Sequence, residues 1–435
     1  MENEKYLEET KTQLTPLLAM EEASRCLLCH DAPCSKACPA GTDPAKFIRS
    51  LRFRNTKGAV ETVRTNNILG GICARVCPST QYCEGACSRC GIDKPIRIGE
   101  LQRYITDYEK NINMKVLDKV EAINGKIAVI GSGPSGVATA SSLASKGYKV
   151  TVFEEKSILG GWLNYGIPPQ RLPKEVVKTE MNYVKDLGVE FKTNCKVGRD
   201  IKIKNLRAQG YEAFLISCGI QKGKSIDVKG SELEGVLNGV NFLGQAKTNE
   251  GNVKIGSHVI VIGGGDVALD CAATAKLLGC EDVKIVYRRT IEKMPADAAE
   301  REYIQSLNIP IFTGFKPLEI KGENGKVSVF KAEGMFDSSQ LELTADMVIF
   351  AVGQESEDIK IIANVEVDGK GIVITENCRT TIEDIFAAGD IVKGDKTVVQ
   401  AVASGKLAAE EIEKYLVAKK ESIKLTRQTA ATKEV

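Results

Sequence analysis

Apolar residues in about the first 110 positions recur at spacings of three and four, the period of amphipathic helices. The stretches PLLAMEEASRCLLC, DPAKFIRSLRFRN and IGELQRYITDYEKN show this period most clearly. A polar connector, NINMKVLDKVEAING, follows, and beyond it the apolar residues form β-branched runs that end in glycines. The pattern predicts a helical N-terminal domain followed by domains built on sheets.

A strand, a glycine turn, an amphipathic helix and a second strand occur twice, at 126–155 and at 258–289. This order is the βαβ unit of a parallel sheet, so the predicted fold class is α/β with two Rossmann-like dinucleotide-binding domains. Apolar strands at 214–220 and 347–354 flank the second unit. We expect one dinucleotide fold to be inserted into the other, with both flanking strands in the outer fold.

Composition and charge exclude several classes of partner. Lys and Arg number 59 against 57 acidic residues, so the net charge is too small to favour binding to nucleic acid or to an anionic membrane. The acidic start MENEKYLEETK has no apolar segment of the kind that a secretory signal needs. No run of eighteen apolar residues occurs. We therefore expect a soluble, cytoplasmic protein without a membrane span.

Cysteines are concentrated near the N-terminus, where nine of the fourteen lie within the first ninety residues. They form two runs, C-x2-C-x4-C-x3-C-P from Cys26 and C-x3-C-P-x4-C-x3-C-x2-C from Cys73. Both are variants of the bacterial ferredoxin run, whose last cysteine reaches to another cluster. Thiolates suit iron–sulfur clusters and zinc alike. Two 4Fe-4S clusters use more of these cysteines than a single zinc site at Cys26, Cys29, Cys87 and Cys90 would.

The first glycine turn, VIGSGPSG, has the pattern G-x-G-x-x-G between a strand and a helix. Its residues are Gly131, Gly133, Pro134, Ser135 and Gly136. The first glycine permits the tight turn, the second lets a pyrophosphate approach the backbone, and the third lets helix and strand pack closely. Glu154 ends the next strand, where a carboxylate can take both ribose hydroxyls. The turn is therefore predicted to bind a dinucleotide.

A second region, TTIEDIFAAGDIVKGDKTVV, indicates which dinucleotide it is, because an apolar strand there ends in Gly-Asp and precedes an amphipathic helix. In flavoproteins with two dinucleotide folds, such an aspartate meets the ribityl chain and such a helix N-terminus meets the flavin ring. The residues are Gly389, Asp390, Thr397 and Val398. Together with the first turn they favour FAD. Gly161 is small enough for the ring to approach, whereas Trp162 is either a ring contact or a core residue.

The second glycine turn, VIGGGDVALD, also lies between a strand and a helix and is predicted to bind NAD(P)H. Its residues are Gly263, Gly264, Gly265, Asp266 and Val267. The following strand ends in Arg288 and Arg289 rather than in an acid. Arginine accepts a ribose 2′-phosphate, so NADPH is favoured over NADH. The alternative is that both arginines are solvated loop residues.

These motifs, in this order, resemble the flavin subunit of bacterial NAD-dependent dihydropyrimidine dehydrogenase. The resemblance runs from about residue 18 to 415 and includes ASRCLLCHDAPCSKACPA, TDPAKFIRS, CARVCP, IGELQRYITDYE, GGW…GIP…RLP, VIGGGDVALD and AAGDIVKGDKTVV. The chain is similar, less closely, to the small subunit of glutamate synthase and to the N-terminal part of the animal dihydropyrimidine dehydrogenase. The two arginines after the second βαβ unit depart from an NAD-linked enzyme and look like those of the NADPH-using relatives.

The resemblance implies a division of the ligands between two clusters. Cluster 1 would be held by Cys26, Cys29, Cys34 and Cys87. Cluster 2 would be held by Cys38, Cys77, Cys83 and the amide of Gln102. Glu100 is the alternative fourth ligand of cluster 2, and Cys73 and Cys90 would be bystanders. The resemblance also places Arg171 near FAD.

The same resemblance implies a function as the electron-input subunit of a hetero-oligomer. Hydride would pass from NAD(P)H to FAD, and single electrons would pass through two 4Fe-4S clusters to an FMN and iron–sulfur partner subunit that acts on uracil or thymine. The FMN barrel of the larger relatives is not encoded in these 435 residues. No side chain is expected to act as acid, base or nucleophile, because the cofactors carry the chemistry. The alternatives are a glutamate synthase-type electron donor and a non-enzymatic, nucleotide-responsive regulator with a zinc domain.

The expected domain boundaries follow from these assignments. The five parts are a helical cluster domain at 1–115, a first FAD-binding part at 116–240, an NAD(P)H-binding domain at 241–346, a second FAD-binding part at 347–420 and a flexible polar tail at 421–435.

Overall fold

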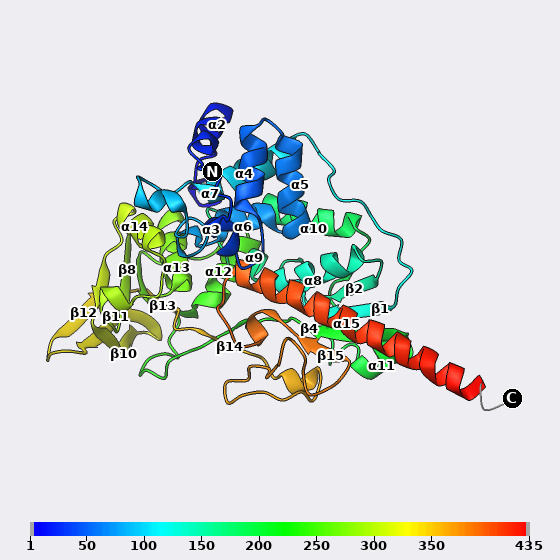
Figure 1. Ribbon diagram of the computed structural model, residues 1–435. Coiled ribbons are helices and arrows are strands. Elements are labelled where there is room, and N and C mark those ends of the chain that lie inside the picture. Colours follow the sequence, from blue (N-terminus) through cyan, green and yellow to red (C-terminus); the bar gives the residue numbers. More distant parts are fainter. Residues whose placement is uncertain (1–3, 432–435) are drawn as a thin grey trace. The chain divides into compact units, whose positions relative to one another are not determined.

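The computed structural model describes residues 4–431, and its elements fall into two compact units (Figure 1). The large unit comprises Thr12–Gly161, Glu175–Gly219 and the chain from Asp358 onward. The small unit comprises the chain up to Lys11, Trp162–Lys174 and Ile220–Glu357. No helix within residues 4–431 combines the length and the apolar character that crossing a membrane requires.

The N-terminal part of the large unit is helical, as the apolar spacing predicts. Its α-helices are α2 Pro16–Ser24, α3 Pro33–Lys36, α4 Pro44–Arg52, α5 Thr56–Asn66, α6 Gly70–Val76 and α7 Ile98–Asn111, with 3-10 turns η1 Ser79–Gln81 and η2 Ser88–Gly91. Side chains cap three of the helices: Thr15, Asp43 and Asn55 accept from the backbone N–H of Leu18, Lys46 and Gly58. Such caps contribute about 1 kcal/mol each. The helices share one core that includes Phe47 and Leu101.

The first βαβ unit forms a five-stranded parallel sheet in the large unit, in the order β15-β4-β1-β2-β3. The strands are β1 Lys126–Ile130, β2 Lys149–Phe153, β3 Glu190–Lys192, β4 Tyr211–Ile216 and β15 Ile385–Ala387. Its helices are α8 Pro134–Ala144, α10 Lys174–Asp186, α11 Ile203–Ala208 and α15 Val398–Ala431. A 3-10 turn, η4 Ile359–Ile361, lies between β4 and β15 in the chain, and another, η5 Gly389–Ile391, follows β15. Strand β15 joins this sheet although the whole second βαβ unit separates it from β4, so the insertion of one fold into the other is confirmed.

The second βαβ unit forms another five-stranded parallel sheet, in the order β6-β13-β7-β8-β9. The strands are β6 Val236–Asn238, β7 His258–Ile262, β8 Asp282–Tyr287, β9 Ile311–Thr313 and β13 Met347–Phe350. The helices of the small unit are α1 Glu4–Leu7, α9 Trp162–Tyr165, α12 Gly239–Thr248, α13 Asp266–Leu277 and α14 Ala298–Ser306, with the 3-10 turn η3 Ile291–Lys293. A separate antiparallel sheet consists of β10 Phe315–Glu323, β11 Lys326–Gly334 and β12 Gln340–Thr344. Two short strands, β5 Lys222–Gly223 and β14 Gln354–Glu355, pair with each other. Apolar side chains fill the space between the two larger sheets of the small unit.

Several boundaries differ from the sequence prediction. The apolar strand at 347–354 contributes β13 to the inner sheet rather than to the outer fold, because β13 pairs with both β6 and β7. Residues 162–174 and the chain up to Lys11 also belong to the small unit. The predicted tail at 421–435 is helical as far as Ala431, since α15 continues through it, and the last four residues lie outside the described range.

Candidate functional site

The three glycines of the first turn have the geometry that a dinucleotide-binding loop requires. Gly131 has φ +107°, and a Cβ there would lie 2.4 Å from the carbonyl oxygen of Ser217. A Cβ on Gly136 would lie 2.1 Å from the carbonyl oxygen of Gly131, so helix and turn are in close contact. A Cβ on Gly133 would meet nothing within 4 Å. The backbone at Gly133, next to Pro134 at the start of α8, is open to a phosphate.

Glu154 lies beside this turn and is buried. One of its carboxylate oxygens accepts hydrogen bonds from the backbone N–H and the hydroxyl of Ser132, at 3.0 and 2.6 Å, and the other accepts from the N–H of Lys156 at 2.9 Å. Each carboxylate oxygen has two lone pairs, so the oxygen that accepts from Lys156 can still accept from one ribose hydroxyl. Ser132 holds the carboxylate in place, a role that the sequence pattern did not indicate.

The turn at Gly389 lies against the start of α8, although the two are far apart in the sequence. Gly389 has φ +79°, and a Cβ there would lie 2.8 Å from the Cβ of Ser135. The Ser135 hydroxyl is buried and makes no hydrogen bond within residues 4–431, so it is free to bind a ligand. Burial raises the pKa of Asp390. The Thr397 hydroxyl accepts from the N–H of Gln400 at 3.3 Å.

Helix α15 begins at Val398, one residue after the predicted Thr397. Its N-terminal turn is therefore next to the Gly389 turn in sequence, and α15 packs along α8. The two segments predicted to hold FAD come together in one place, as the prediction requires.

Gly161, another predicted FAD contact, lies at this turn. A Cβ on Gly161 would lie 3.2 Å from the Cα of Gly133. Trp162 belongs to the small unit, where its indole covers Gly166: a Cβ on that glycine would lie 2.0 Å from the ring. Trp162 is half-buried there, which fits the packing alternative.

Arg171, which the resemblance places near FAD, belongs to an ion-pair network of the small unit. Its guanidinium donates to both carboxylate oxygens of Asp270 at 2.9 Å, and its Nε lies 3.4 Å from Glu300. All three residues belong to the small unit and the Arg171 side chain is nearly buried. These carboxylates compensate the positive charge of Arg171, because a buried charge without a partner of opposite sign is strongly unfavourable.

The second glycine turn repeats the geometry of the first. Gly263 has φ +152°, and a Cβ there would lie 2.3 Å from the carbonyl oxygen of Ala351. A Cβ on Gly264 would touch the ring of Tyr287, whereas one on Gly265 would meet only a proline carbon at 3.9 Å. The backbone at Gly265, at the start of α13, is thus the open position.

Some side chains near the second turn are engaged in contacts with the protein, and others are not. Asp266 accepts a hydrogen bond from the N–H of Asp297 at 3.3 Å, which anchors a neighbouring loop, and Val267 packs against the core. Arg288 and Arg289 are exposed just beyond β8, and neither guanidinium makes a hydrogen bond or ion pair within residues 4–431. Both are free to bind an anion.

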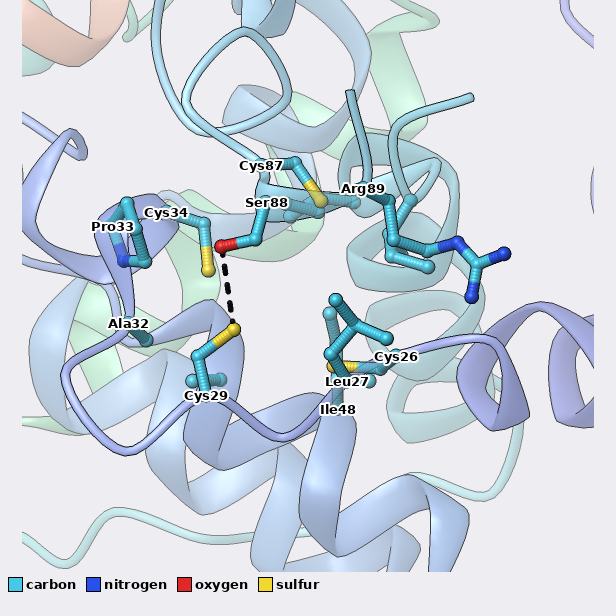
Figure 2. A pocket seen from close by; sticks show the side chains of 13 residues that line it. Cys26, Leu27, Cys29, Ala32, Pro33, Cys34, Ile48, Cys87, Ser88 and Arg89 are labelled. Atoms are coloured by element: carbon cyan, nitrogen blue, oxygen red, sulfur yellow. Dashed lines mark hydrogen bonds between the residues drawn. The ribbon is translucent and has the colours of Figure 1, made fainter. Parts of the chain in front are cut away.

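Four cysteines surround a cavity in the N-terminal helical part (Figure 2). They are Cys26, Cys29, Cys34 and Cys87, the set implied for cluster 1. Leu27, Ile48, Ile96 and Ile98 supply apolar walls. Figure 2 shows the sulfur atoms facing the cavity from the 26–29 loop, from α3 and from the start of η2. Such a site suits a group larger than one ion, held by thiolates within apolar walls.

Two of the thiols that line this cavity have raised pKa values. Burial raises the pKa of Cys34 to about 11 and also raises that of Cys26, and neighbouring thiolates add to both shifts. Binding a metal therefore has to displace protons from these sulfurs.

The zinc alternative uses Cys90 in place of Cys34, and the structure separates the two. Cys90 is exposed, and its thiol donates to the carbonyl oxygen of Glu84 at 3.4 Å instead of lining the cavity. Within residues 4–431 no three His, Cys, Asp or Glu side chains are grouped for a single metal ion.

A second group of thiols includes the cysteines implied for cluster 2. The pKa of Cys83 is raised to about 12 by burial first, then by Glu84 and by Cys38. The pKa of Cys77 is raised by burial, with Cys73, Cys83 and Cys38 adding to the shift. Cys38 thus contributes to the raised pKa of both Cys77 and Cys83, and the buried Cys73 contributes to that of Cys77.

Gln102 and Glu100 lie on opposite sides of α7, because two residues are about 200° apart on a helix. Gln102 is buried, and its amide nitrogen donates to the carbonyl oxygen of Gly70 at the start of α6, at 2.7 Å. No hydrogen bond to its amide oxygen occurs within residues 4–431. Glu100 is paired with Arg97 at 3.0 Å and its side chain is 40% exposed. Gln102 is therefore the residue directed into the helical part, with its oxygen available.

Helix α15 reaches the cysteine-rich part from the Gly389 turn (Figure 1). The amide nitrogen of Gln400 lies 3.5 Å from the hydroxyl of Tyr82, next to Cys83. Further along the same helix, Lys406 donates to the carbonyl oxygens of Ala40 and Asn66 at 2.7 and 2.9 Å. Burial lowers the pKa of Lys406, and negative charge at Cys38 opposes that shift. The sequence analysis did not predict these contacts, because they join residues more than 300 positions apart and no local pattern indicates them.

A buried ion-pair network, also missed from the sequence, supports the same region. Glu180 on α10 accepts from Arg64 at 2.5 Å and from the backbone N–H groups of Gly71 and Ile72 at 2.6 and 3.1 Å. Arg64 also donates to Glu109 on α7 at 2.8 Å. Glu180 thus caps α6, the helix that carries Cys73.

Comparison with known proteins agrees with the combination of a cysteine-rich helical part and two dinucleotide-binding folds. Residues 125–405 match the family described as pyridine nucleotide-disulphide oxidoreductase, and residues 3–114 match the one described as dihydropyrimidine dehydrogenase domain II, 4Fe-4S cluster. Among solved structures, Mycobacterium tuberculosis FprA in complex with NADPH has a TM-score of 0.59 at 19% identity, over 69% of this chain and 86% of that one. Thioredoxin reductase of T. acidophilum has a TM-score of 0.54 at 20% identity, over 68% and 99%. These two likenesses concern the fold alone.

Relatives of known name are similar over nearly the full length. The NAD-dependent dihydropyrimidine dehydrogenase subunit PreT of Salmonella typhimurium is 44% identical over 416 residues, which cover 96% of this chain and 98% of that protein. The glutamate synthase (NADPH) small chain of Escherichia coli is 31% identical over 433 residues, covering 92% and 91%.

The fold and the site define a pyridine-nucleotide flavoprotein oxidoreductase that carries an N-terminal 4Fe-4S domain. Within that class, the chain belongs to the family of the NAD-dependent dihydropyrimidine dehydrogenase subunit PreT. The resemblance and the α/β fold class predicted from the sequence are both confirmed. Membership implies FAD, NAD(P) and 4Fe-4S iron–sulfur as cofactors, and the open glycine turns and the thiol-lined cavity fit these groups.

Proposed function

We propose that this chain is the electron-input subunit of a dihydropyrimidine dehydrogenase, taking hydride from NAD(P)H and releasing single electrons through two 4Fe-4S clusters. When bound, FAD supplies the conversion from two-electron to one-electron chemistry. One observation carries the proposal: α15 connects the predicted flavin turn to the cysteine-rich part, with contacts from Gln400 to Tyr82 and from Lys406 to Ala40. The chain's own task is to hold the three redox groups in a fixed order.

The proposed FAD site is made by the first glycine turn and the Gly389 turn. Its residues are Gly131, Gly133, Pro134, Ser135, Gly136, Glu154, Gly161, Gly389, Asp390, Thr397 and Val398. The pyrophosphate would lie at the open backbone of Gly133, and Glu154 would accept from the ribose. The free hydroxyl of Ser135 supports this placement, because a buried hydroxyl without a partner is costly.

The proposed cluster ligands are those implied by the resemblance. Cys26, Cys29, Cys34 and Cys87 would hold cluster 1, and Cys38, Cys77, Cys83 and Gln102 would hold cluster 2. The cavity in Figure 2 supports the first set, and the mutual pKa effects of the thiols support the second. Because α15 adjoins Cys38 and Tyr82, cluster 2 would be the one nearer FAD.

The second turn would bind NAD(P)H, and we favour NADPH. The two unpaired guanidinium groups of Arg288 and Arg289 support this choice, since a 2′-phosphate offers them charge-assisted hydrogen bonds. The names of the relatives point both ways, because PreT is called NAD-dependent and the glutamate synthase small chain is named with NADPH. The inner fold, spanning Ile220–Glu357, would be the nucleotide domain.

The proposed partner is an FMN and iron–sulfur subunit acting on uracil or thymine. PreT and the glutamate synthase small chain are both named as parts of larger enzymes, which supports a hetero-oligomer. The higher identity to PreT favours the pyrimidine enzyme over the glutamate synthase role. We place the complex in the cytoplasm on the basis of the sequence.

Anaerobic titration with NADH and then with NADPH tests the proposal. Flavin absorbance should bleach first and cluster absorbance should follow, and iron and acid-labile sulfide should be present in the amounts that two clusters need. Zinc without sulfide, or a chain that binds no flavin, would contradict the proposal and would support the nucleotide-responsive regulator instead.

A further inference from the structure

Helix α4 presents an exposed stripe of basic and aromatic side chains. Lys46, Arg49 and Phe53 are spaced at i, i+3 and i+7, so they share one face of the helix and its C-cap. All three are exposed, and Phe53 is 70% exposed. Arg54, also exposed, follows directly with φ +59°. We call these four residues the α4 stripe.

The charges of the α4 stripe are not neutralised by the chain itself. Lys46, Arg49 and Arg54 make no ion pair within residues 4–431, and no Asp or Glu occurs between positions 44 and 60. Two arginines from other segments near the cysteine cavity are different, one in its lining and one next to Cys26. Arg89 pairs with Asp93 at 2.5 Å, and Arg25 pairs with Glu22 at 2.7 Å. Among these basic residues, only those of the α4 stripe have no acidic partner within residues 4–431.

The α4 stripe adjoins the cavity of the four thiols. Ala45 and Ile48, on the neighbouring face of α4, line that cavity. Arg52, one turn after Ile48, donates to the carbonyl oxygen of Cys26 at 3.0 Å. Leu27, which lines the cavity, is itself 47% exposed. The cavity therefore opens near a surface that combines unpaired positive charge with exposed apolar side chains.

We propose that the α4 stripe is the docking surface for the acidic face of the redox protein that accepts electrons from cluster 1. The inference rests on the proposed function. Charge complementarity selects the occupant: an acidic surface is steered toward unpaired Lys and Arg side chains, and Phe53 provides an apolar anchor at the centre of contact. The near-neutral chain as a whole, with 59 basic and 57 acidic residues, argues against a polyanion such as nucleic acid.

The overall reaction with a haem acceptor balances as follows. One NAD(P)H gives two electrons and yields NAD(P)+ and one proton, while two ferric haems each take one electron and become ferrous. Cytochrome b5, an acidic haem protein, is a suitable probe for the acidic acceptor, and basic cytochrome c is its counterpart. A small uncharged quinone measures electron delivery without a protein surface.

The test compares two variants with the same change in charge. Lys46→Glu with Arg49→Glu reverses the stripe, and Lys202→Glu with Lys204→Glu makes the same change on exposed residues at α11, away from α4 in Figure 1. We expect the stripe variant to raise KM for cytochrome b5 at least tenfold and to lose the salt dependence of that reaction. Its KM for cytochrome c should not rise, and its quinone rate, iron content and flavin content should stay within twofold of wild type. Phe53→Ala should raise the same KM at constant charge.

Three outcomes would overturn the docking surface. The first is an unchanged KM for cytochrome b5 in the stripe variant, and the second is an equal rise in the α11 variant. The third is loss of binding to phosphatidylserine vesicles with unchanged cytochrome kinetics, which would assign the stripe to a membrane. If wild-type protein fails to pass electrons from NAD(P)H even to the quinone, the proposed function fails, and the docking surface with it.

Discussion

At the scale of single residues, the two cysteines Cys34 and Cys90 make the assignment of cluster 1 testable. Cys34 lines the cavity, whereas the exposed Cys90 donates to a backbone carbonyl. Cys34→Ala should lose the absorbance and iron of one cluster and keep FAD, because the flavin turn is built from other segments. Cys90→Ala is the matched control and should retain full iron. Full iron in both variants, measured with sulfide under anaerobic conditions, would contradict the ligand set.

Nucleotide choice also depends on single residues. Replacing Arg288 and Arg289 by alanine removes two guanidinium groups that have no protein partner within the described residues. Charge-assisted hydrogen bonds contribute about 1.5–3 kcal/mol each, so KM for NADPH should rise about tenfold or more. KM for NADH should stay within twofold, because NADH has no 2′-phosphate. Arg199→Ala, in the other unit, serves as the control in steady-state assays. Equal effects on both nucleotides would show that the arginines do not select the phosphate.

At the scale of elements, the N-terminus of α6 is capped by the carboxylate of Glu180, which lies on α10. Glu180→Ala would leave two backbone N–H groups of α6 unpaired and would remove one of the two carboxylates that pair with Arg64. Breaking a buried ion pair costs about 3–5 kcal/mol, so thermal stability should fall clearly. Because α6 ends at Val76, directly before the proposed ligand Cys77, about half of the iron should be lost.

The control for this variant lies on the same helix. Glu175 is exposed in the first turn of α10, so Glu175→Ala should change neither stability nor iron content. If Glu180→Ala loses stability but keeps all of its iron, the carboxylate supports the fold without positioning cluster 2.

Features of these elements could be predicted from the sequence where they depend on neighbouring residues in the chain. The glycine turns could be predicted, because a positive φ and the absence of a Cβ are requirements of the turn itself. Glu180 could not, since its partner Arg64 is 116 positions away and a charge in an amphipathic helix is ordinarily solvated. The two strand-forming segments at 214–220 and 347–354 look alike, and only pairing in the folded sheets separates them.

At the scale of the whole molecule, the chain passes more than once between the two units. The small unit is assembled from three stretches, one of which, Trp162–Lys174, follows the first βαβ unit directly in sequence. The sequence predicts it as part of the FAD domain because it adjoins Gly161. What decides its place is the set of contacts it makes with α12 and α13, including the pair of Arg171 with Asp270.

Lys247 on α12 is the other anchor of this stretch, and we expect it to make the stability of the small unit dependent on pH. Its ammonium group donates to the carbonyl oxygens of Leu163, Ile167 and Leu172 at 2.7, 2.6 and 3.0 Å. Burial lowers the pKa of Lys247 to about 7. A lysine in the unfolded chain titrates near pH 10.4, so between about pH 7 and pH 10 the unfolded state holds more protons than the folded one. The free energy of unfolding should therefore rise with pH across that window.

The effect can be followed with the sole tryptophan of the chain, Trp162, which begins the anchored stretch. In urea titrations monitored by its fluorescence, the rise between pH 7.5 and pH 9 should be about 2 kcal/mol larger in wild type than in Lys247→Met. The methionine variant lacks the titrating group, so its slope shows what all other groups contribute. Lys254→Met removes an exposed lysine of the same unit and should keep the wild-type slope. Identical slopes in wild type and Lys247→Met would mean that Lys247 keeps its proton when folded, held by the three carbonyl oxygens, and that this anchor does not respond to pH.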